Sequence, residues 1–313
     1  MKRKGNLYNN MCKLENIKSV MHEVCKNTKN KNKVNRFKEF ETINTYRIHY
    51  TLVNRQYKVG TYHVFIIYEP KKRRIVSQSM FDKVINHLVA RYVLLPALEP
   101  SLLDTNVASR EGRGTEAGLK YYYEYRRLCK QKYHRYYILK CDVKKFFASI
   151  DHDILKEKLK RKIKDKDALK IVYDIIDSEE DGLGIGNMTS QILAIFYLND
   201  LDYYIKEVLH IKYYVRYQDD FLLFHESKQY LRECLDKIRD YLKKENLELN
   251  KKTRIYNNNS NIIYLGRDRQ GRYARYRTIN RKLKKRFYMY KKREISFNSY
   301  LNSIRNFQNL KKI

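Results

Sequence analysis

Two adjacent aspartates, Asp219 and Asp220, lie between two short apolar runs, and no other feature constrains the fold of this chain more. The runs, 213–217 and 221–224, have the length and composition of strands, so the sequence predicts a hairpin with both carboxylates at its tip. Neighbouring anions in apolar surroundings repel each other and lose hydration, which is costly unless a cation compensates. Asp is also common in solvated turns, so the pair alone leaves two interpretations open.

A third carboxylate, Asp142, lies near the end of the short apolar run 137–143. Together with Asp219 and Asp220 it would suit Mg²⁺, a hard ion that prefers oxygen ligands, and Mn²⁺ could replace that ion. In a site with two such ions, one activates a primer 3′-hydroxyl and the other holds the leaving diphosphate. The three aspartates are therefore the candidate centre of a two-metal nucleotidyl transfer.

The order of expected elements places these carboxylates on neighbouring strands. In chain order the middle of the sequence predicts a strand at 137–143, two helices between 153 and 178, a glycine loop at 182–186, a helix at 190–209, a hairpin at 213–224, a helix at 230–242 and a strand at 262–265. This order matches the split β-α-β arrangement of a ferredoxin-like sheet. The expected fold class is therefore α+β.

The flanking segments are less regular. We expect residues 1–35 to be a polar, frayed or short helical lead-in, 62–68 a strand followed by a turn at 69–74, 81–98 a helix closed by Pro96 and Pro100, and 272–313 a strongly basic helical tail.

The charge of the chain points to a polyanionic partner. Its 67 Lys and Arg against 35 Asp and Glu give a formal net charge of +32, which favours phosphate binding through counterion release. No apolar run approaches the roughly 18–20 residues that span a bilayer, so no membrane association is expected. The polar start resembles no signal peptide, and the five cysteines show no CxxC spacing. These features favour a reducing, cytoplasmic location.

At the aspartates the chain resembles the reverse transcriptases. Tyr-Gln-Asp-Asp at 217–220 resembles their YxDD signature, and Asp-Val-Lys-Lys-Phe-Phe at 142–147 resembles their first palm motif. The resemblance implies that the three aspartates are catalytic and bind metal, with Val143 beside them at the metal site. It also implies that Phe147 screens the sugar 2′-position and favours dNTP over NTP.

A variant of the second palm motif narrows the resemblance. Many reverse transcriptases have Gln-Gly-x-x-x-Ser-Pro, whereas here Ile185 takes the place of the Gln and Gln191 that of the Pro. This variant resembles the reverse transcriptases of diversity-generating retroelements. Ile185, Gly186 and Gln191 would then contact the incoming nucleotide, and the loss of a polar side chain there puts ordinary fidelity in doubt.

Two further motifs would supply cations for the triphosphate. The segment 70–75 resembles the fingers hairpin, in which Lys71 and Arg74 would hold the phosphates. The segment 247–253 resembles the motif whose lysine could protonate the diphosphate leaving group, and Lys252 fits that role, although a surface lysine is nearly as good an interpretation.

Two segments would contact the nucleic-acid strands. The segment 109–115 resembles an Arg-x-Gly-Lys-Gly-Thr motif, so Arg110, Arg113 and Thr115 are expected to contact the template. The segment Tyr264, Leu265 and Gly266 resembles the primer-grip motif.

The resemblance implies a right-hand polymerase with fingers, a ferredoxin-like palm and a short, helical, basic thumb. We expect the fingers at 36–136, with a template-contacting segment at 105–120, the palm at 137–266 and the thumb at 267–313. The expected partners are a structured, non-coding template RNA, a cDNA or primer strand and dNTPs, with a small basic accessory protein or self-association as further options.

Several biological roles share this chemistry. The second-motif variant favours a diversity-generating retroelement enzyme that copies a dedicated RNA into cDNA. An antiphage defence-associated or retron-like enzyme using a non-coding RNA is the alternative. A non-catalytic, maturase-like RNA-binding scaffold is disfavoured by the three intact aspartates, and an RNA-dependent RNA polymerase is disfavoured by Phe147 and Tyr217.

Overall fold

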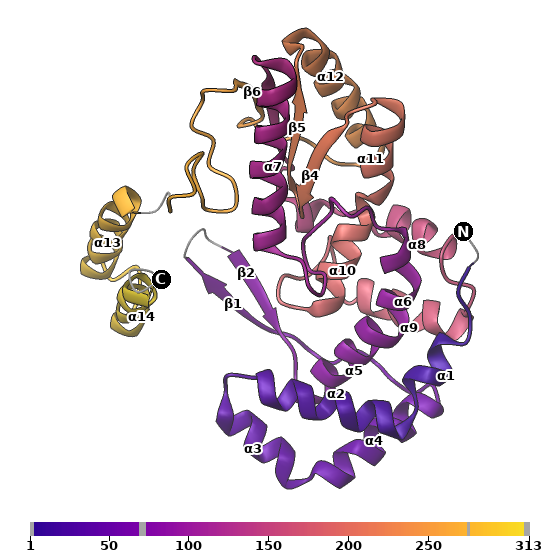
Figure 1. Ribbon diagram of the computed structural model, residues 1–313. Coiled ribbons are helices and arrows are strands. Elements are labelled where there is room, and N and C mark those ends of the chain that lie inside the picture. The colour runs from indigo at the N-terminus through magenta and orange to yellow at the C-terminus, as the bar shows by residue number, and fades with distance from the viewer. Residues whose placement is uncertain (1–2, 69–72, 274–275, 310–313) are drawn as a thin grey trace.

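A four-stranded antiparallel sheet places the aspartates in space (Figure 1). The computed structural model describes residues 3–68, 73–273 and 276–309. The strands lie in the order β4–β5–β3–β6, and their bounds are β3 (Tyr137–Asp142), β4 (Tyr213–Tyr217), β5 (Asp220–His225) and β6 (Arg254–Asn257). Helices separate β3 from β4 and β5 from β6, so the expected ferredoxin-like topology of the palm is confirmed.

Strand alternation gives this sheet two different apolar faces. One face carries Ile138, Leu222 and Phe224 and is covered by α7 (Thr115–Tyr133), which runs along β4 and β5 in Figure 1. The other face carries Leu139 and Leu223. It joins the larger core, together with α8 (His152–Lys160), α9 (Lys166–Ile176), α10 (Met188–Tyr197) and α12 (Lys228–Lys244).

The N-terminal segment is part of this larger core, and of the two forms expected over 1–35, frayed or short helical, it takes the helical one. The segment forms α1 (Leu7–Met11), α2 (Leu14–Asn27) and the first half of α3 (Lys31–Glu39), and α2 packs against α4 (Glu41–Val53) and α5 (Met80–Val89). Helix α2 buries Ile17, Val20, Met21, Val24 and Cys25. Their spacing is that of a single helical face, which the intervening polar residues obscure in the sequence.

The fingers also contain a hairpin, β1 (His63–Ile67) and β2 (Arg73–Ser77), as expected. The helix expected over 81–98 is found as α5, a π-helical turn (Ala90–Leu94) and α6 (Leu95–Leu98), and a 3₁₀ turn (Glu99–Ser101) follows. Pro96 lies in the first turn of α6, where its missing N–H is tolerated. Pro100 lies in the last turn, so only the second proline closes the helix.

Two other elements differ from expectation. The helix expected at 190–209 is divided into α10, α11 (Asn199–Tyr203) and a π-helical turn (Tyr204–Val208). The strand expected at 262–265 is wrong, because Leu265 and Gly266 have φ values of 47° and 81° and turn the chain back on itself. The buried side chains of Ile262 and Tyr264 gave this turn the apolar pattern of a strand.

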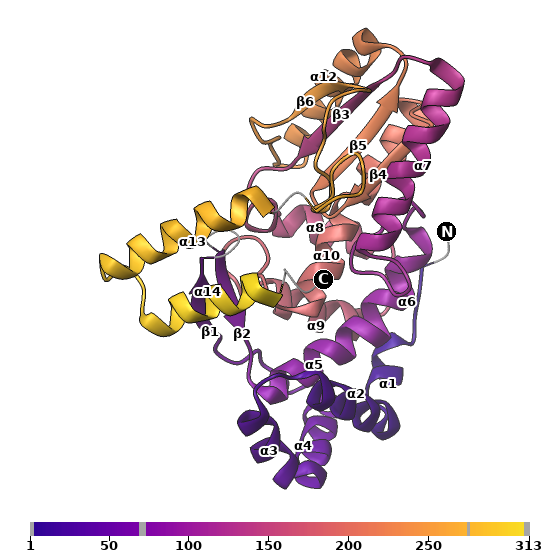
Figure 2. The ribbon, with the colours of Figure 1, turned by 60° about the vertical axis from the view of Figure 1, so that its left-hand side comes forward.

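The basic C-terminal segment is helical, as expected. Helices α13 (Tyr276–Lys291) and α14 (Phe297–Asn309) pack on each other and lie to one side of the sheet (Figure 2). Arg286 is buried between them, donates to Ser299 and Ser303, and lies 5.6 Å from the ring centre of Tyr68 at the end of the fingers hairpin. The thumb therefore contacts the fingers.

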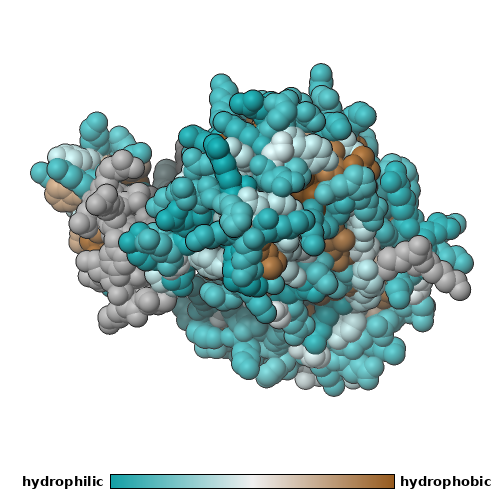
Figure 3. Space-filling model, turned by 45° about the horizontal axis from the view of Figure 1, so that its top comes forward, coloured by the Kyte–Doolittle hydropathy of each residue, from teal (hydrophilic) through white to brown (hydrophobic). Residues whose placement is uncertain are grey.

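The face of the molecule in Figure 3 is mostly hydrophilic, with small separate apolar patches, as the composition requires. None of the described helices is both long and apolar enough to cross a membrane.

Candidate active site

Two aspartates of the predicted centre, Asp142 and Asp220, lie side by side on neighbouring strands of the sheet. Asp142 ends β3 and Asp220 begins β5, and the antiparallel register pairs them directly. Directly paired residues point to the same face, so both side chains share the face that α7 covers further along the sheet. The strand register thus brings these two carboxylates together, as the sequence predicts.

Asp219 is held beside them by main-chain hydrogen bonds. The N–H of Val143 donates to the carbonyl oxygen of Asp219 at 3.2 Å, and the N–H of Asn250 donates to the carbonyl oxygen of Asp142 at 2.7 Å. The turn itself is closed by Gln218, whose φ of 56° is left-handed. The turn, the end of β3 and the 248–250 segment therefore form one continuous backbone platform.

A buried arginine supports this turn from behind. Arg216 on β4 is fully buried and pairs with Asp202 of α11 through two hydrogen bonds of 2.7 and 2.5 Å. Its remaining donors reach the carbonyl oxygens of Ile195 and Gln218, both at 2.9 Å. Tyr214 also donates to Asp202 at 2.6 Å, so this carboxylate accepts three hydrogen bonds inside the core.

A lysine lies directly against the carboxylates. The ammonium group of Lys140 donates to Asp220 Oδ2 at 2.9 Å, while Asp220 Oδ1 is buried without a hydrogen-bond partner in the described part of the chain. Burial raises the pKa of Asp220 to about 6. Lys140 opposes that rise, and the negative charges of Asp142 and Asp219 add to it.

The donor set fits a divalent cation. A buried carboxylate oxygen that accepts no hydrogen bond from the described residues, beside two further carboxylates, is the environment that an oxygen-seeking ion such as Mg²⁺ would satisfy. Within the described residues, however, no three His, Cys, Asp or Glu side chains converge closely enough to hold a metal as they stand.

A glycine loop brings the expected nucleotide contacts together. The N–H of Leu183 donates to the carbonyl oxygen of Phe147 at 2.7 Å, and the N–H of Val76 on β2 donates to that of Ile185 at 3.0 Å. The loop thus joins the half-buried ring of Phe147 to the fingers hairpin. Gly186 has a φ of 130°, and a Cβ there would lie 2.6 Å from the carbonyl oxygen of Val76, so this approach requires glycine.

The expected phosphate-binding cations are only partly described. Arg74 on β2 is exposed and forms an ion pair of 3.0 Å with Glu179, which precedes the glycine loop. Lys71 lies outside the described residues. Lys252 is exposed in the turn at 250–253, directly after the segment bonded to Asp142.

The sequence comparison agrees with this geometry. The family described as reverse transcriptase (RNA-dependent DNA polymerase) matches residues 63–268, well over half of the chain. The chain belongs to the reverse transcriptase family. Enzymes of this family are nucleotidyltransferases, and the matched region contains the hairpin, the glycine loop and all three aspartates. Among curated proteins, no sequence matches this chain.

Solved telomerase structures share the fold. Apo telomerase from Candida tropicalis, truncated from its C-terminal domain, superposes with a TM-score of 0.52 at 18% identity, covering 68% of this chain and 53% of that one. Telomerase from the same organism with a TWJ fragment of telomeric RNA gives a TM-score of 0.52 at 15% identity, covering 73% and 48%. The reverse transcriptase chain thus spans about half the length of these neighbours.

The expected template-contacting arginines of this reverse transcriptase are engaged within the chain. The Arg110 side chain is only 4% exposed, pairs with Glu99 at 2.7 Å and donates to the carbonyl oxygens of Leu103 and Asn106. Arg113 pairs with Asp104 at 2.7 Å and is 29% exposed. Arg110 therefore shapes its loop from inside, which the sequence pattern alone did not indicate.

This loop connects the turn that carries Asp219 to the second palm motif. Gln218 Nε2 donates to Ser109 Oγ at 2.9 Å, and Ser109 Oγ donates to Gln191 Oε1 at 3.1 Å. Gln191 and Ser109 also line a cavity of about 620 Å³ that extends to His87 and Arg91 of the fingers. The structure thus places Gln191 beside the loop expected to contact the template. Thr115 begins α7 at the end of this loop and is exposed.

The expected primer-grip residues pack between α7 and the carboxylates. Tyr264 is fully buried, and its hydroxyl has no hydrogen-bond partner among the described residues. Leu265 lies against Gly118 of α7, where an added Cβ would meet the leucine Cδ1 at 2.6 Å. Gly266 completes the left-handed turn.

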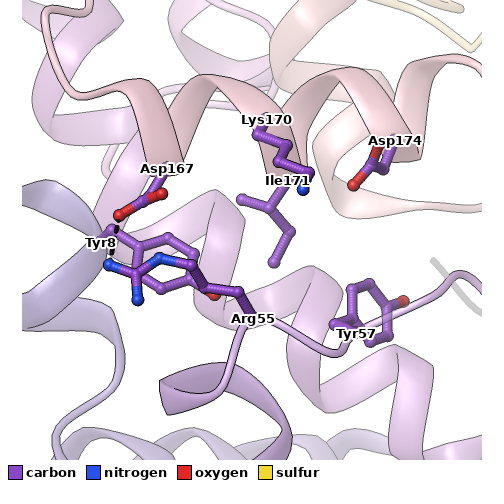
Figure 4. Close-up of a pocket in the computed structure, with 7 residues that line it drawn as sticks. All are labelled: Tyr8, Arg55, Tyr57, Asp167, Lys170, Ile171 and Asp174. Atoms are coloured by element: carbon purple, nitrogen blue, oxygen red, sulfur yellow. Dashed lines mark hydrogen bonds and ion pairs between the residues drawn. The ribbon is translucent and has the colours of Figure 1, made fainter.

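A small pocket elsewhere in the molecule has no role in this site. Its lining includes Tyr8, Tyr57 and the Arg55–Asp167 ion pair of 2.7 Å, whose arrangement is drawn in Figure 4. Its volume of about 20 Å³ holds little more than one water molecule.

Sequence reasoning missed three positioning residues, Lys140, Arg216 and Asp202. Period-two alternation places Lys140 on the same face as Asp142, so a charged residue two positions before the aspartate was a usable signal. Arg216 likewise interrupts an apolar strand. Nothing in the sequence indicated its partner Asp202, because the pairing depends on the tertiary fold.

Proposed function

We propose that this chain is an RNA-directed DNA polymerase that copies a dedicated, structured RNA into cDNA. The observation that carries the proposal is the register that sets Asp142 against Asp220, with Asp219 in the connecting turn, in a chain of the reverse transcriptase family. Two carboxylates at the hairpin and a third at the end of the neighbouring strand β3 match the needs of nucleotidyl transfer, whose metal ions are held by oxygen ligands.

In this mechanism the chain positions its substrates by rigid contacts. Asp142, Asp219 and Asp220, with Val143 beside them, would hold two Mg²⁺ ions, or Mn²⁺, which activate the primer 3′-hydroxyl and stabilise the leaving diphosphate. Phe147, fixed by the glycine loop, would exclude a ribose 2′-hydroxyl from the incoming nucleotide.

Cations around the triphosphate would complete the nucleotide site. Arg74, together with Lys71, would contact the phosphates, and Lys252 would protonate the diphosphate as it leaves. Arg74 would first have to leave Glu179, whose side chain is only 10% exposed.

The template RNA is the expected occupant of the cavity between the fingers and α10. His87, Arg91 and Gln191 line it together with Glu23, which pairs with Arg91, and Glu111. The net charge of +32 of the whole chain favours any nucleic acid. The Candida tropicalis telomerase was solved with an RNA fragment, which agrees with an RNA template for a chain of this fold.

The diversity-generating retroelement type is the biological role that we propose. It rests on Ile185 and Gln191, which depart from the common second palm motif. A small basic accessory protein would assist such an enzyme. An antiphage or retron-like enzyme shares the chemistry, and sequencing the RNA that copurifies with the protein separates the two roles.

Primer extension on poly-A RNA with labelled dNTPs tests the activity. We expect the double variant Asp219→Ala with Asp220→Ala to lose DNA synthesis by at least about 10³-fold, since the ligands of both ions are removed. Asp236→Ala with Asp240→Ala, on the exposed surface of α12, is the matched control and should keep full activity. Full DNA synthesis by the variant Asp219→Ala with Asp220→Ala would show that the assignment of these aspartates as catalytic residues is wrong.

A further inference from the structure

We propose that Lys140 is a positioning residue that links metal loading to the primer-holding turn of this enzyme. It acts as a tethered cation that holds Asp220 in the metal-free protein and yields this carboxylate when a metal binds. The inference rests on the proposed function, because it concerns the same aspartates.

The geometry of Lys140 joins two parts of the site. Its ammonium group lies 2.9 Å from Asp220 Oδ2 and 2.9 Å from the carbonyl oxygen of Ile263. The same group lies 5.6 Å from the ring centre of the buried Tyr264. One side chain thus contacts both a catalytic carboxylate and the segment expected to grip the primer.

The strand fixes this bridge in place. Lys140 lies two residues before Asp142 on β3, so both side chains emerge on the same face. The Lys140 side chain is 22% exposed and that of Asp220 is 23% exposed, so neither is a freely solvated surface group. An ion pair with this degree of burial is screened less than a surface pair.

Two properties of the Lys140 ammonium group explain its competition with a metal ion: its positive charge and its three hydrogen-bond donors. A divalent ion on Asp220 would lie within a few ångströms of the ammonium group and repel it. The ammonium has three N–H donors, so it can leave Asp220 and still hold the Ile263 carbonyl. Metal binding would then shift Lys140 toward the 263–266 turn and stabilise the primer-holding conformation.

This coupling predicts opposite effects of removing the charge. Without the ammonium group of Lys140, no cation at this position competes with the metal ion for Asp220. The free protein should therefore bind metal more tightly. The same change leaves the Ile263 carbonyl without its donor, so primer use should become worse. A residue with a purely structural role would weaken both properties together.

Metal binding can be measured without catalysis. We expect Lys140→Met to tighten Mn²⁺ binding, measured by electron paramagnetic resonance in the absence of nucleic acid and dNTPs, by about 3- to 10-fold. Lys140→Arg keeps the charge and should bind Mn²⁺ like the wild type, as should Lys243→Met on the exposed surface of α12. Adding Asp220→Ala to the wild type and to the Lys140→Met variant should abolish the difference between them, which assigns the effect to this carboxylate.

Primer extension supplies the second readout. Lys140→Met should raise the KM for primer–template several-fold more than it lowers kcat at saturating primer, because the affected contact holds the primer segment. Lys140→Gln retains a donor for Ile263 without the charge, and it should tighten Mn²⁺ binding with a smaller change in primer KM. This variant keeps the proposal testable if the methionine variant does not fold.

The outcomes separate this inference from the proposed function. Unchanged or weaker Mn²⁺ binding in both uncharged variants would overturn the role of Lys140, even if the wild type makes DNA. Tighter Mn²⁺ binding that depends on Asp220, in a protein without polymerase activity, would support the competition at Asp220 and contradict the proposed function instead.

Discussion

At the scale of single residues, Asp220 shows how burial and charge combine at a position that we propose to be catalytic. Its folded-state pKa of about 6 lies above that of an unfolded aspartate, about 3.9. As the pH rises from about 4 to 6, the unfolded chain therefore ionises at this residue before the folded protein does. The metal-free protein should lose roughly 1–3 kcal/mol of stability from this group over that window.

Urea unfolding in EDTA at several pH values measures this loss. The free energy of unfolding of the wild type relative to Asp220→Asn should fall as the pH rises from 4 to 6, because the other titrating groups are common to both proteins. A difference that does not change with pH would contradict the raised pKa. Well above the folded-state pKa of about 6, where Asp220 is ionised in both states, the difference should be constant.

Ile185 allows a separate prediction about fidelity. Its carbonyl oxygen accepts a hydrogen bond from Val76, so a side-chain replacement leaves this main-chain contact intact. Ile185→Gln should restore a polar contact near the incoming base and change misincorporation rates by roughly 3- to 10-fold, the effect of one net hydrogen bond. Sequencing of cDNA products measures this, with Ile185→Leu as the control, and an unchanged error spectrum would remove the fidelity argument.

The aspartates could be predicted from the sequence, whereas their supports could not. Adjacent carboxylates in an apolar hairpin carry an energetic cost that is visible without a structure. Arg110 was also identified, yet its pattern could not show whether the guanidinium faces RNA or its own loop, and it does the latter. Burial of an arginine depends on distant partners such as Glu99, which periodicity does not reveal.

At the scale of elements, the turn that carries Asp219 depends on β4 and α11 through one buried ion pair, Arg216–Asp202. Arg216→Met would leave Asp202 buried without its cation, and we expect a loss of about 3–5 kcal/mol in the free energy of unfolding. Arg239→Met breaks an exposed pair with Asp236 on α12 and should cost less than about 1 kcal/mol. Chemical denaturation of both variants tests this contrast, and equal losses would contradict it.

The elements predicted well are those whose periodicity and end signals agree. Asp151 begins α8 by accepting from two backbone N–H groups, and the hairpin 213–224 lies where its two apolar runs predicted it. The strand expected at 262–265 failed because apolar burial was interpreted as extended backbone. The helix at 190–209 breaks after Leu198 without Gly or Pro, so no local signal marked the interruption.

At the scale of the whole molecule, the net positive charge attracts nucleic acid. The distribution of that charge over the surface determines which elements hold the bound duplex. The paired helices α13 and α14 contact the fingers hairpin through Arg286 and Tyr68, so fingers and thumb are linked away from the palm sheet (Figure 2). Family membership could be inferred from ordered motifs, but this link could not, since neither residue belongs to a motif that the sequence shares with the family.

The exposed lysines of α13 should therefore contribute directly to duplex binding. Lys284→Glu with Lys285→Glu should weaken binding of an RNA–DNA duplex and lower the slope of log affinity against log salt by about 1.5–2, as two lost phosphate contacts require. Lys243→Glu with Lys244→Glu changes the charge equally on the exposed surface of α12 and should alter that slope by much less. Fluorescence anisotropy over a salt series measures both slopes. Equal effects would mean that overall charge attracts the duplex, whereas a selective effect of the first pair would identify α13 as a surface that grips it.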